Sequence, residues 1–150
     1  MTKIKEPSIQ IFVEQEVLTT QQDLLDILAD HEGLARFFKA EFSIVRESNA
    51  GEMKGGKGCI RRVSSGKNQF NEEITAASKK GISYKIVGAG PVTDHRGDIV
   101  FNNKGRSTLI HYHISFNGPK WVPDFLVKTI VTKDMKKGLL KLADYFKGKL

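Results

Sequence analysis

Residues 106–117, Arg-Ser-Thr-Leu-Ile-His-Tyr-His-Ile-Ser-Phe-Asn, carry the clearest structural pattern in the chain. Their side chains alternate between a largely apolar set and a polar set, which are Thr108, Ile110, Tyr112, Ile114 and Phe116 on one face and Ser107, His111, His113 and Ser115 on the other. Because successive side chains of a strand point to opposite faces, this period of two predicts a strand with one buried face.

A long amphipathic helix is predicted directly after this strand. Gly118 ends the alternation, and Pro123-Asp124 is a typical helix start. Apolar side chains then recur at helical spacing while lysines occupy much of the remainder, and the apolar stripe comprises Phe125, Met135, Leu139, Leu142 and Phe146. We expect this stripe to face the sheet.

Turn residues divide the preceding stretch into short alternating segments. The breaks at Asn49–Gly51, Gly55-Gly56, Ser65-Gly66, Lys79–Gly81, Gly88–Pro91 and Asn102–Gly105 leave room for strands near residues 41–48, 57–65, 69–78, 81–88 and 95–102. Together with residues 106–117, these segments predict an antiparallel meander of six strands.

One more strand and two short helices precede the meander. Residues Ser8–Val17 alternate with a period of two, which predicts a half-buried strand. Thr20 followed by Asp23 resembles a capping box, because the hydroxyl can accept an amide hydrogen of the first helical turn. A second short helix is expected to begin at Asp30 and to carry the apolar residues up to Phe38.

The order strand, two helices, six strands, helix predicts an α+β fold of the helix-grip type. In such a fold a curved, seven-stranded antiparallel sheet wraps around a long C-terminal helix, with two short helices after the first strand. One helix cannot fill the concave side of seven strands. The architecture therefore predicts an internal apolar cavity between sheet and helix, and such hollows are common ligand sites.

Composition narrows the class of protein further. At 150 residues, with 39% hydrophobic and 27% charged residues, we expect residues 1–150 to form a single globular domain. No apolar stretch approaches the roughly 20 residues of a membrane-spanning helix, and Met1–Pro7 lacks the apolar segment of a signal peptide. The lone Cys59 cannot form an internal disulfide, so we expect a cytoplasmic protein.

The net charge of +7 is concentrated near the C-terminus. Lys120–Leu150 contains eight lysines and three aspartates. This surface is either a solvated helix face or a contact site for nucleic acid or anionic lipid. The strands lack the basic and aromatic signature of an RNA-recognition sheet, so nucleic acid is the less favoured partner.

The chain resembles the START-like superfamily (SRPBCC), which includes Bet v 1-type proteins, polyketide cyclases and lipid-transfer domains. The resemblance rests on the order and spacing of Gly58–Val63, Glu72–Thr75, Ile82–Ile86, His95–Ile99, Thr108–Tyr112 and Gly138–Leu142. The chain is most similar to the small bacterial polyketide cyclase/dehydrase-like group. Residues 64–68 lack the Leu-Pro gate of the related plant hormone receptors, which argues against a gated receptor role.

The resemblance implies a ligand cavity lined by alternate strand residues and no cofactor. In the family, every second strand residue faces the cavity, and we carry this alternation over to the matching positions here. It turns Glu72 and His95 inward as candidate acid/base residues. The candidate ligand contacts that it turns inward are Arg61, Val63, Ile74, Tyr84, Ile86, Ile99, Tyr112 and Ile114. The simple alternation of apolar residues gives the same face for most of them.

Arg61, Glu72 and His95 form the most informative polar group among these residues. A charged side chain on an inward face must be paired or contact a polar ligand, and Arg61 and Glu72 lie on neighbouring predicted strands. His95 could transfer protons to or from a bound ketone or hydroxyl, because imidazole titrates near neutral pH. The alternative is a structural ion pair beside a structural histidine.

Three other features allow both a functional and a structural interpretation. Tyr84 and Tyr112 could each orient a polar group of an apolar ligand through the hydroxyl, or simply pack in the core. His111 and His113 share a face at a spacing that can chelate a metal, but that face is the outer one, so we predict surface histidines and no metal site. Gly51–Gly58 nearly matches a phosphate-binding loop, yet a strand follows where that motif needs a helix, so we predict a flexible loop.

Three functions follow as hypotheses. The first is a module that binds a hydrophobic small molecule, such as a lipid, a polyketide or another aromatic metabolite, in the internal cavity. The second is an aromatase, cyclase or dehydratase that uses His95 and Glu72 to move protons. The third is a basic binder of nucleic acid or a membrane surface. The sequence leaves the ligand, any catalysis and the oligomeric state open.

Overall fold

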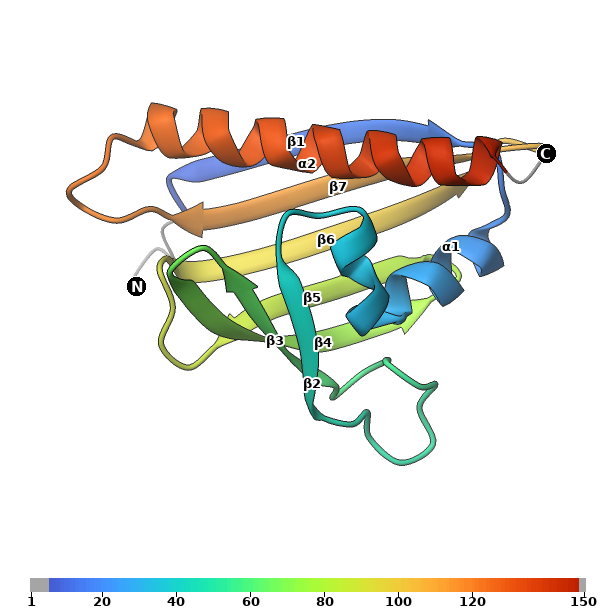
Figure 1. Cartoon of the computed structure of the whole chain (residues 1–150), viewed down its shortest axis with the longest axis horizontal. Helices are drawn as coiled ribbons and strands as arrows, with labels where there is room; N and C mark the ends of the chain where they lie inside the picture. Colours follow the sequence, from blue (N-terminus) through green and yellow to red (C-terminus); the bar gives the residue numbers. More distant parts are fainter. Residues whose placement is uncertain (1–5, 149–150) are drawn as a thin grey trace, which may run out of the picture.

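The computed structural model of the chain describes residues 6–148. Its elements follow the predicted order of one strand, two short helices, six strands and one long helix (Figure 1). In chain order they are β1 (Ile9–Val17), α1 (Gln21–Ala29), the 3₁₀ helix η1 (His31–Arg36), β2 (Glu41–Arg46), β3 (Ile60–Ser65), β4 (Asn68–Ser78), β5 (Gly81–Val87), β6 (Thr93–Asn103), β7 (Thr108–Asn117) and α2 (Asp124–Lys147).

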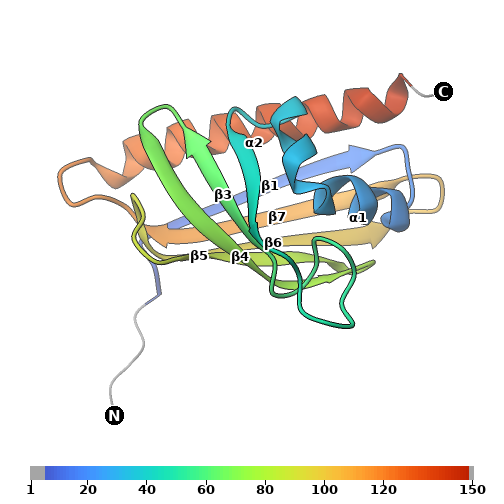
Figure 2. The ribbon, with the colours of Figure 1, turned by 60° about the horizontal axis from the view of Figure 1, so that its bottom comes forward.

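The strands form one antiparallel sheet in the order β1-β7-β6-β5-β4-β3-β2. Consecutive strands β1 and β2 therefore lie at opposite edges, and α1 and η1 span the distance between them. The long helix α2 runs along the concave side of the curved sheet and packs against β1 (Figures 1 and 2). This arrangement confirms the predicted helix-grip fold.

The period of two in β7 places its side chains as expected. Ile110, Tyr112 and Ile114 are buried on the concave face, and His111 and His113 are only half-buried on the outer one. Ser115 is buried as well, although it lies on the outer face. Its register partners are Gln10 on β1 and Arg96 on β6, and both have longer side chains than Ser115.

The start of α1 confirms the predicted cap. The Thr20 hydroxyl accepts a hydrogen bond from the Asp23 amide at 3.1 Å, and the Asp23 carboxylate accepts one from the Thr19 hydroxyl at 2.7 Å. These contacts satisfy an amide that the first helical turn cannot satisfy itself. The cap fixes where α1 begins and thus directs its buried residues, including Leu28, toward the interior.

The apolar stripe predicted for α2 is wrong at its first member. Leu139, Leu142 and Phe146 are buried, but Phe125 is 72% exposed. Phe125 and Ala143 are 18 residues apart and so share one flank of the helix. In the first half of α2 the side chains that pack against the core are instead Val127, Val131 and Met135. Phe125 lies about 160° around the helix axis from Val127 and therefore points away from the core there.

The glycine-rich segment at residues 51–58 forms a loop, and β3 begins after it at Ile60. Gly55 and Gly58 have positive φ angles of 76° and 90°, which other residues rarely adopt. A side chain at Gly55 would also lie 2.2 Å from the Ala29 carbonyl oxygen. The loop therefore packs closely against the end of α1. Of the strand predicted at residues 57–65, residues 60–65 form β3.

Candidate functional site

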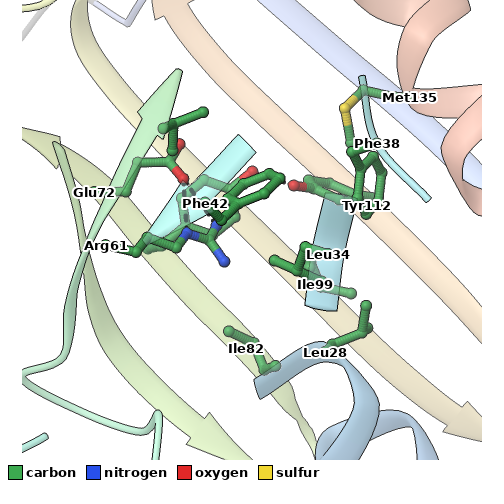
Figure 3. A pocket seen from close by; sticks show the side chains of 12 residues that line it. Leu28, Leu34, Phe38, Phe42, Arg61, Glu72, Ile82, Ile99, Tyr112 and Met135 are labelled. Atoms are coloured by element: carbon green, nitrogen blue, oxygen red, sulfur yellow. Dashed lines mark hydrogen bonds and ion pairs between the residues drawn. The ribbon is translucent and has the colours of Figure 1, made fainter. Parts of the chain in front are cut away.

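An apolar cavity lies between the concave face of the sheet and the helices that cover it. Its volume is about 140 Å³ and it opens partly to solvent. The strands, α1, η1, the segment leading into β2, and α2 each supply part of its wall (Figure 3), and the lining residues are Leu28, Leu34, Phe38, Phe42, Arg61, Val63, Glu72, Ile82, Tyr84, Ile99, Tyr112 and Met135. The predicted hollow is thus present in the fold.

The helical side of the cavity depends on one glycine. Phe38 follows η1 and reaches across to α2, where Gly138 faces it. A Cβ atom at position 138 would stand 2.4 Å from two carbons of the Phe38 ring, well inside van der Waals contact. Gly138 therefore allows Phe38 to pack directly against α2. Phe38 and Met135 together cover the cavity on this side.

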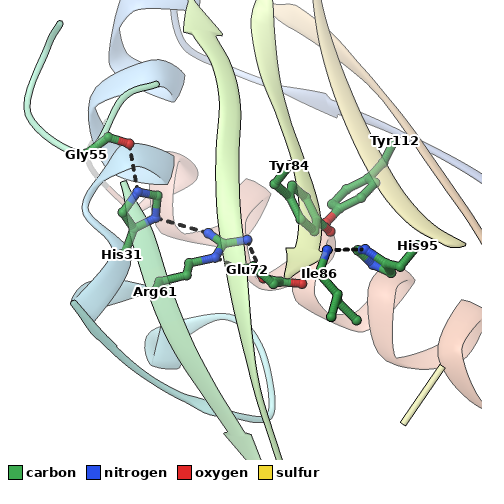
Figure 4. A network of polar contacts seen from close by, with 8 residues as sticks. All are labelled: His31, Gly55, Arg61, Glu72, Tyr84, Ile86, His95 and Tyr112. Atoms are coloured by element: carbon green, nitrogen blue, oxygen red, sulfur yellow. Dashed lines mark hydrogen bonds and ion pairs between the residues drawn. The ribbon is translucent and has the colours of Figure 1, made fainter. Parts of the chain in front are cut away.

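A polar wall stands opposite this cover. Arg61 of β3 and Glu72 of β4 are register partners, and each is only 6% exposed. Arg61 Nε donates to Glu72 Oε1 at 2.9 Å, and Arg61 Nη2 approaches the same oxygen at 2.8 Å (Figure 4). The pair predicted from neighbouring strands therefore forms, and each charge neutralises the other inside the cavity wall.

His31, which sequence reasoning did not identify, completes this network. Arg61 Nη1 donates to His31 Nδ1 at 3.0 Å, and His31 Nε2 donates to the Gly55 carbonyl oxygen at 2.8 Å. The Arg61 guanidinium can only donate hydrogen bonds, so His31 Nδ1 must accept. These contacts therefore require the neutral imidazole with its proton on Nε2. Burial, followed by the charge of Arg61, lowers the pKa of His31 to about 4.

Two tyrosines form the rest of the polar wall. The hydroxyls of Tyr84 on β5 and Tyr112 on β7 are hydrogen-bonded to each other. Burial raises the pKa of both phenols, so each hydroxyl keeps its proton at neutral pH. The Arg61 guanidinium lies 4.8 Å from the centre of the Tyr84 ring, which joins the tyrosine pair to the ion pair.

Gly97 provides the space that the Tyr84 ring occupies. The two residues are register partners on β5 and β6. A Cβ atom at Gly97 would lie 2.3 Å from the Tyr84 ring, so only glycine allows the ring to lie flat over the neighbouring strand. The position of the Tyr84 hydroxyl at the cavity thus depends on a residue of the next strand.

His95 lies beside this wall, and the cavity lining does not include it. Its Nδ1 accepts a hydrogen bond from the Ile86 amide at 3.2 Å, and its ring centre is 5.5 Å from that of Tyr84 (Figure 4). Burial lowers the pKa of His95, while the nearby Glu72 opposes that shift. The imidazole is therefore neutral and one aromatic ring away from the cavity.

The predicted site residues thus fall into two groups. The cavity lining includes Arg61, Val63, Glu72, Tyr84, Ile99 and Tyr112. Ile74 and Ile114 are buried in the hydrophobic core, Ile86 is half-buried, and His95 stands behind Tyr84. Sequence reasoning missed the lining residues that come from the helices or from other strand positions, namely Leu28, Leu34, Phe38, Phe42, Ile82 and Met135.

The remaining candidate groups lie elsewhere. His111 Nδ1 is 2.9 Å from Glu14 Oε1, and the His113 ring stacks on Phe12 at 4.3 Å, both on the outer face of the sheet. Cys59 is fully buried, and burial raises the pKa of its thiol. Within residues 6–148, no three or more His, Cys, Asp and Glu side chains come together in a group that could hold a metal ion.

None of the helices in the described part of the chain has the length and apolar character needed to cross a membrane.

Comparison with known proteins identifies the family of the chain and structures that share its fold. Residues 8–147 match the family model described as polyketide cyclase / dehydrase and lipid transport. No curated protein matches the chain. Among solved structures, a START superfamily protein from Mycobacterium smegmatis has 14% identity and a TM-score of 0.79, with 94% of this chain and 99% of that chain covered.

Two further structures share the fold. XoxI from Bacillus cereus has 14% identity and a TM-score of 0.70, with 91% of this chain and 94% of that chain covered. A Thermus thermophilus protein, TTHA0849, has 18% identity and a TM-score of 0.66, with 89% of this chain and 92% of that chain covered. At these sequence identities, the similarity to solved structures shows the fold alone.

Proposed function

The chain belongs to the polyketide cyclase/dehydrase and lipid transport family, and we propose that it binds a small apolar molecule carrying one neutral polar group. The observation that carries this proposal is the cavity with one polar wall in an otherwise apolar lining. We propose further that residues 1–150 act as one ligand-binding domain. The absence of a second cysteine to pair with Cys59 supports a reducing compartment, the cytoplasm.

The size of the cavity limits the ligand. Apolar protein cavities of roughly 150 Å³ hold a molecule about as large as benzene. The cavity of about 140 Å³ therefore suits a single aromatic ring or a similar compact group. A lipid chain or a polycyclic polyketide would need more space, which movement of the covering side chains Phe38, Phe42 and Met135 would supply.

The polar wall limits the ligand's polar group. The charge of Arg61 is already balanced by Glu72, and His31 is neutral. A ligand carboxylate would therefore add an unbalanced charge to a buried site, which is unfavourable. The protonated Tyr84 and Tyr112 hydroxyls can instead donate to and accept from a neutral partner. This supports a ketone, phenol or alcohol as the recognised group.

Isothermal titration calorimetry with phenol tests the binding proposal. Phenol has one aromatic ring and one neutral hydroxyl, so it matches both the size of the cavity and its polar wall. We expect saturable binding to one site. Replacing the lining residue Val63 with Phe should fill the cavity and weaken binding at least about tenfold, the effect of losing roughly 1.4 kcal/mol.

The matched control is Val100→Phe. Val100 is 44% exposed on β6, so the same substitution there leaves the cavity unchanged. Equal loss of binding in both variants, or no saturable binding to the parent protein, would refute the proposed ligand site.

As a second candidate function we propose proton transfer to or from the bound molecule. It is favoured by the gathering of Arg61, Glu72 and the two tyrosines at one wall, since such groups cluster at catalytic sites. His95 would act with Glu72 from behind Tyr84. His95→Ala should then abolish turnover of an aromatic ketone while binding is retained, and unchanged turnover would remove His95 from the mechanism.

A further inference from the structure

The start of α2 and the residues before it carry an unusual set of exposed apolar side chains. Four of the nine large hydrophobic residues that are exposed on the described surface lie within ten positions. We call them the Trp121 patch: Trp121, 85% exposed; Phe125, 72%; Ile130, 54%; and Leu126, 44%. In both views of the ribbon the loop that leads into α2 projects at one end of the molecule (Figures 1 and 2). The patch is thus accessible to a large partner.

Lysines are interspersed with this patch and continue beyond it along α2. Residues 120–141 contain six lysines, all exposed, against Asp124 and Asp134, and so contribute +4 of the chain's net +7. The lysines are Lys120, Lys128, Lys133, Lys136, Lys137 and Lys141. A surface that combines this charge with large apolar side chains fits a partner that is both anionic and apolar.

The order of residues along α2 puts the two kinds of side chain on one face. Leu126, Ile130, Lys133, Lys137 and Leu140 follow one another at spacings of four, three, four and three, so they share the helix face turned away from the buried Leu142. Leu140 is 52% exposed, which extends the apolar part of that face by a further turn. The outer face of α2 is therefore mixed apolar and basic over most of its length.

We propose that the Trp121 patch and its lysines dock on the surface of an anionic lipid bilayer. Trp and Phe side chains favour the interface between headgroups and acyl chains, and lysines near the surface are attracted to anionic lipid. Nucleic acid would use the lysines but would leave the four apolar side chains without a role. A second copy of the chain would bring two like charges of +4 together, which opposes association.

The docking face and the cavity share one helix. Met135 lines the cavity from the inner face of α2, whereas Lys133 is exposed on the outer face. A bilayer in contact with the outer face would therefore be separated from the cavity by the width of one helix. Docking itself requires only the surface residues, so it does not depend on what the cavity binds.

The only tryptophan of the chain makes the test direct, because Trp121 lies in the patch and reports on its own environment. Protein is mixed with vesicles of phosphatidylcholine alone, with vesicles of equal parts phosphatidylcholine and phosphatidylglycerol, and with duplex DNA. We expect sedimentation with the mixed vesicles, a shift of Trp121 emission to shorter wavelength on those vesicles, and little of either with neutral vesicles.

Two variants test the two kinds of contact. Replacing Phe125 and Ile130 with Ser should remove most of the binding and the emission shift. Replacing Lys133, Lys136 and Lys137 with Glu should weaken binding to the mixed vesicles at least about tenfold. The matched control replaces Lys67, Lys79 and Lys104, which are exposed on turns of the sheet, with Glu. This control makes the same change in net charge, and it should lose far less binding to the mixed vesicles.

Circular dichroism verifies that each variant is folded. Equal losses in the two Lys→Glu variants would overturn the proposal, as would binding to mixed vesicles without a shift of Trp121 emission. Tighter binding to duplex DNA than to mixed vesicles would overturn it in favour of nucleic acid. A Trp121 shift that depends only on protein concentration would overturn it in favour of self-association.

Discussion

Arg61 and Glu72 form an ion pair across β3 and β4 at 2.8 Å with almost no exposure to water. Two charges taken out of water are costly unless they stay together, and their removal from water is offset here by direct pairing and by the contact of Arg61 with His31. The pair therefore ties two strands together and at the same time supplies the cavity with a polar wall that carries no net charge.

Breaking this pair should destabilise the protein strongly. Glu72→Leu leaves the Arg61 charge buried without its partner, and we expect the free energy of unfolding to fall by about 3–5 kcal/mol. The double variant Arg61→Met/Glu72→Leu removes both charges and should recover most of that loss. Urea unfolding monitored by circular dichroism measures both values. A double variant as unstable as the single one would contradict this account.

His31 should make stability depend on pH. Its pKa is about 4 in the folded chain against 6.5 in the reference state, so the unfolded chain takes up the proton first. The contribution of His31 to the free energy of unfolding is therefore fully present above pH 6.5, and it is lost as the pH falls toward about 4. The contribution is on the order of 3 kcal/mol.

The variant His31→Gln isolates this effect. The glutamine amide can donate to the Gly55 carbonyl and accept from Arg61, but it does not titrate. Urea midpoints measured across the acidic range should fall less steeply with decreasing pH in His31→Gln than in the parent protein. Parallel pH profiles would show that His31 is not the group responsible.

Gly97→Ala should disturb the cavity from outside it. The added methyl would overlap the Tyr84 ring, and overpacking of this kind costs about 1–3 kcal/mol of stability. In a Tyr84→Ala background the same change has no ring to displace and should cost much less. A double-mutant cycle from urea unfolding measures this coupling, and additive losses would contradict the contact.

The tyrosine hydroxyls should select for a polar ligand. Tyr84→Phe and Tyr112→Phe each remove one hydroxyl from the cavity wall and keep the ring. We expect the affinity for phenol to fall about 5–10-fold in either variant, the effect of losing a hydrogen bond of roughly 1 kcal/mol. The affinity for benzene, which has no hydroxyl, should not fall. Titration calorimetry with each ligand gives both affinities, and equal losses for the two ligands would exclude selection by the hydroxyls.

Local patterns explain why much of the fold was predictable. The alternation in β7 and the Thr20 cap depend on neighbours in sequence, and both are present as predicted. The pairing of Arg61 with Glu72 also followed from the sequence, because a short turn joins β3 to β4 and sets their register. The polar half of the cavity could be anticipated for this reason.

Contacts between distant segments explain what was missed. His31 reaches Arg61 across 30 residues, and no local pattern marks that histidine as part of the network. Phe38 lines the cavity only because α2 approaches closely at Gly138, and Phe125 is exposed because the first half of α2 packs through Val127 and Val131 instead. Each of these outcomes is decided by packing between elements, which the periodicity of one segment does not encode.

The proposed ligand site lies between the sheet and α2. Nuclear Overhauser contacts between the ring protons of bound phenol and the side chains of the protein locate the ligand. We expect contacts to Leu34, Ile82 and Ile99 of the cavity lining and none to the exposed Val45 and Val100. Contacts confined to exposed side chains, or the absence of any bound phenol, would rule out a ligand site in the cavity.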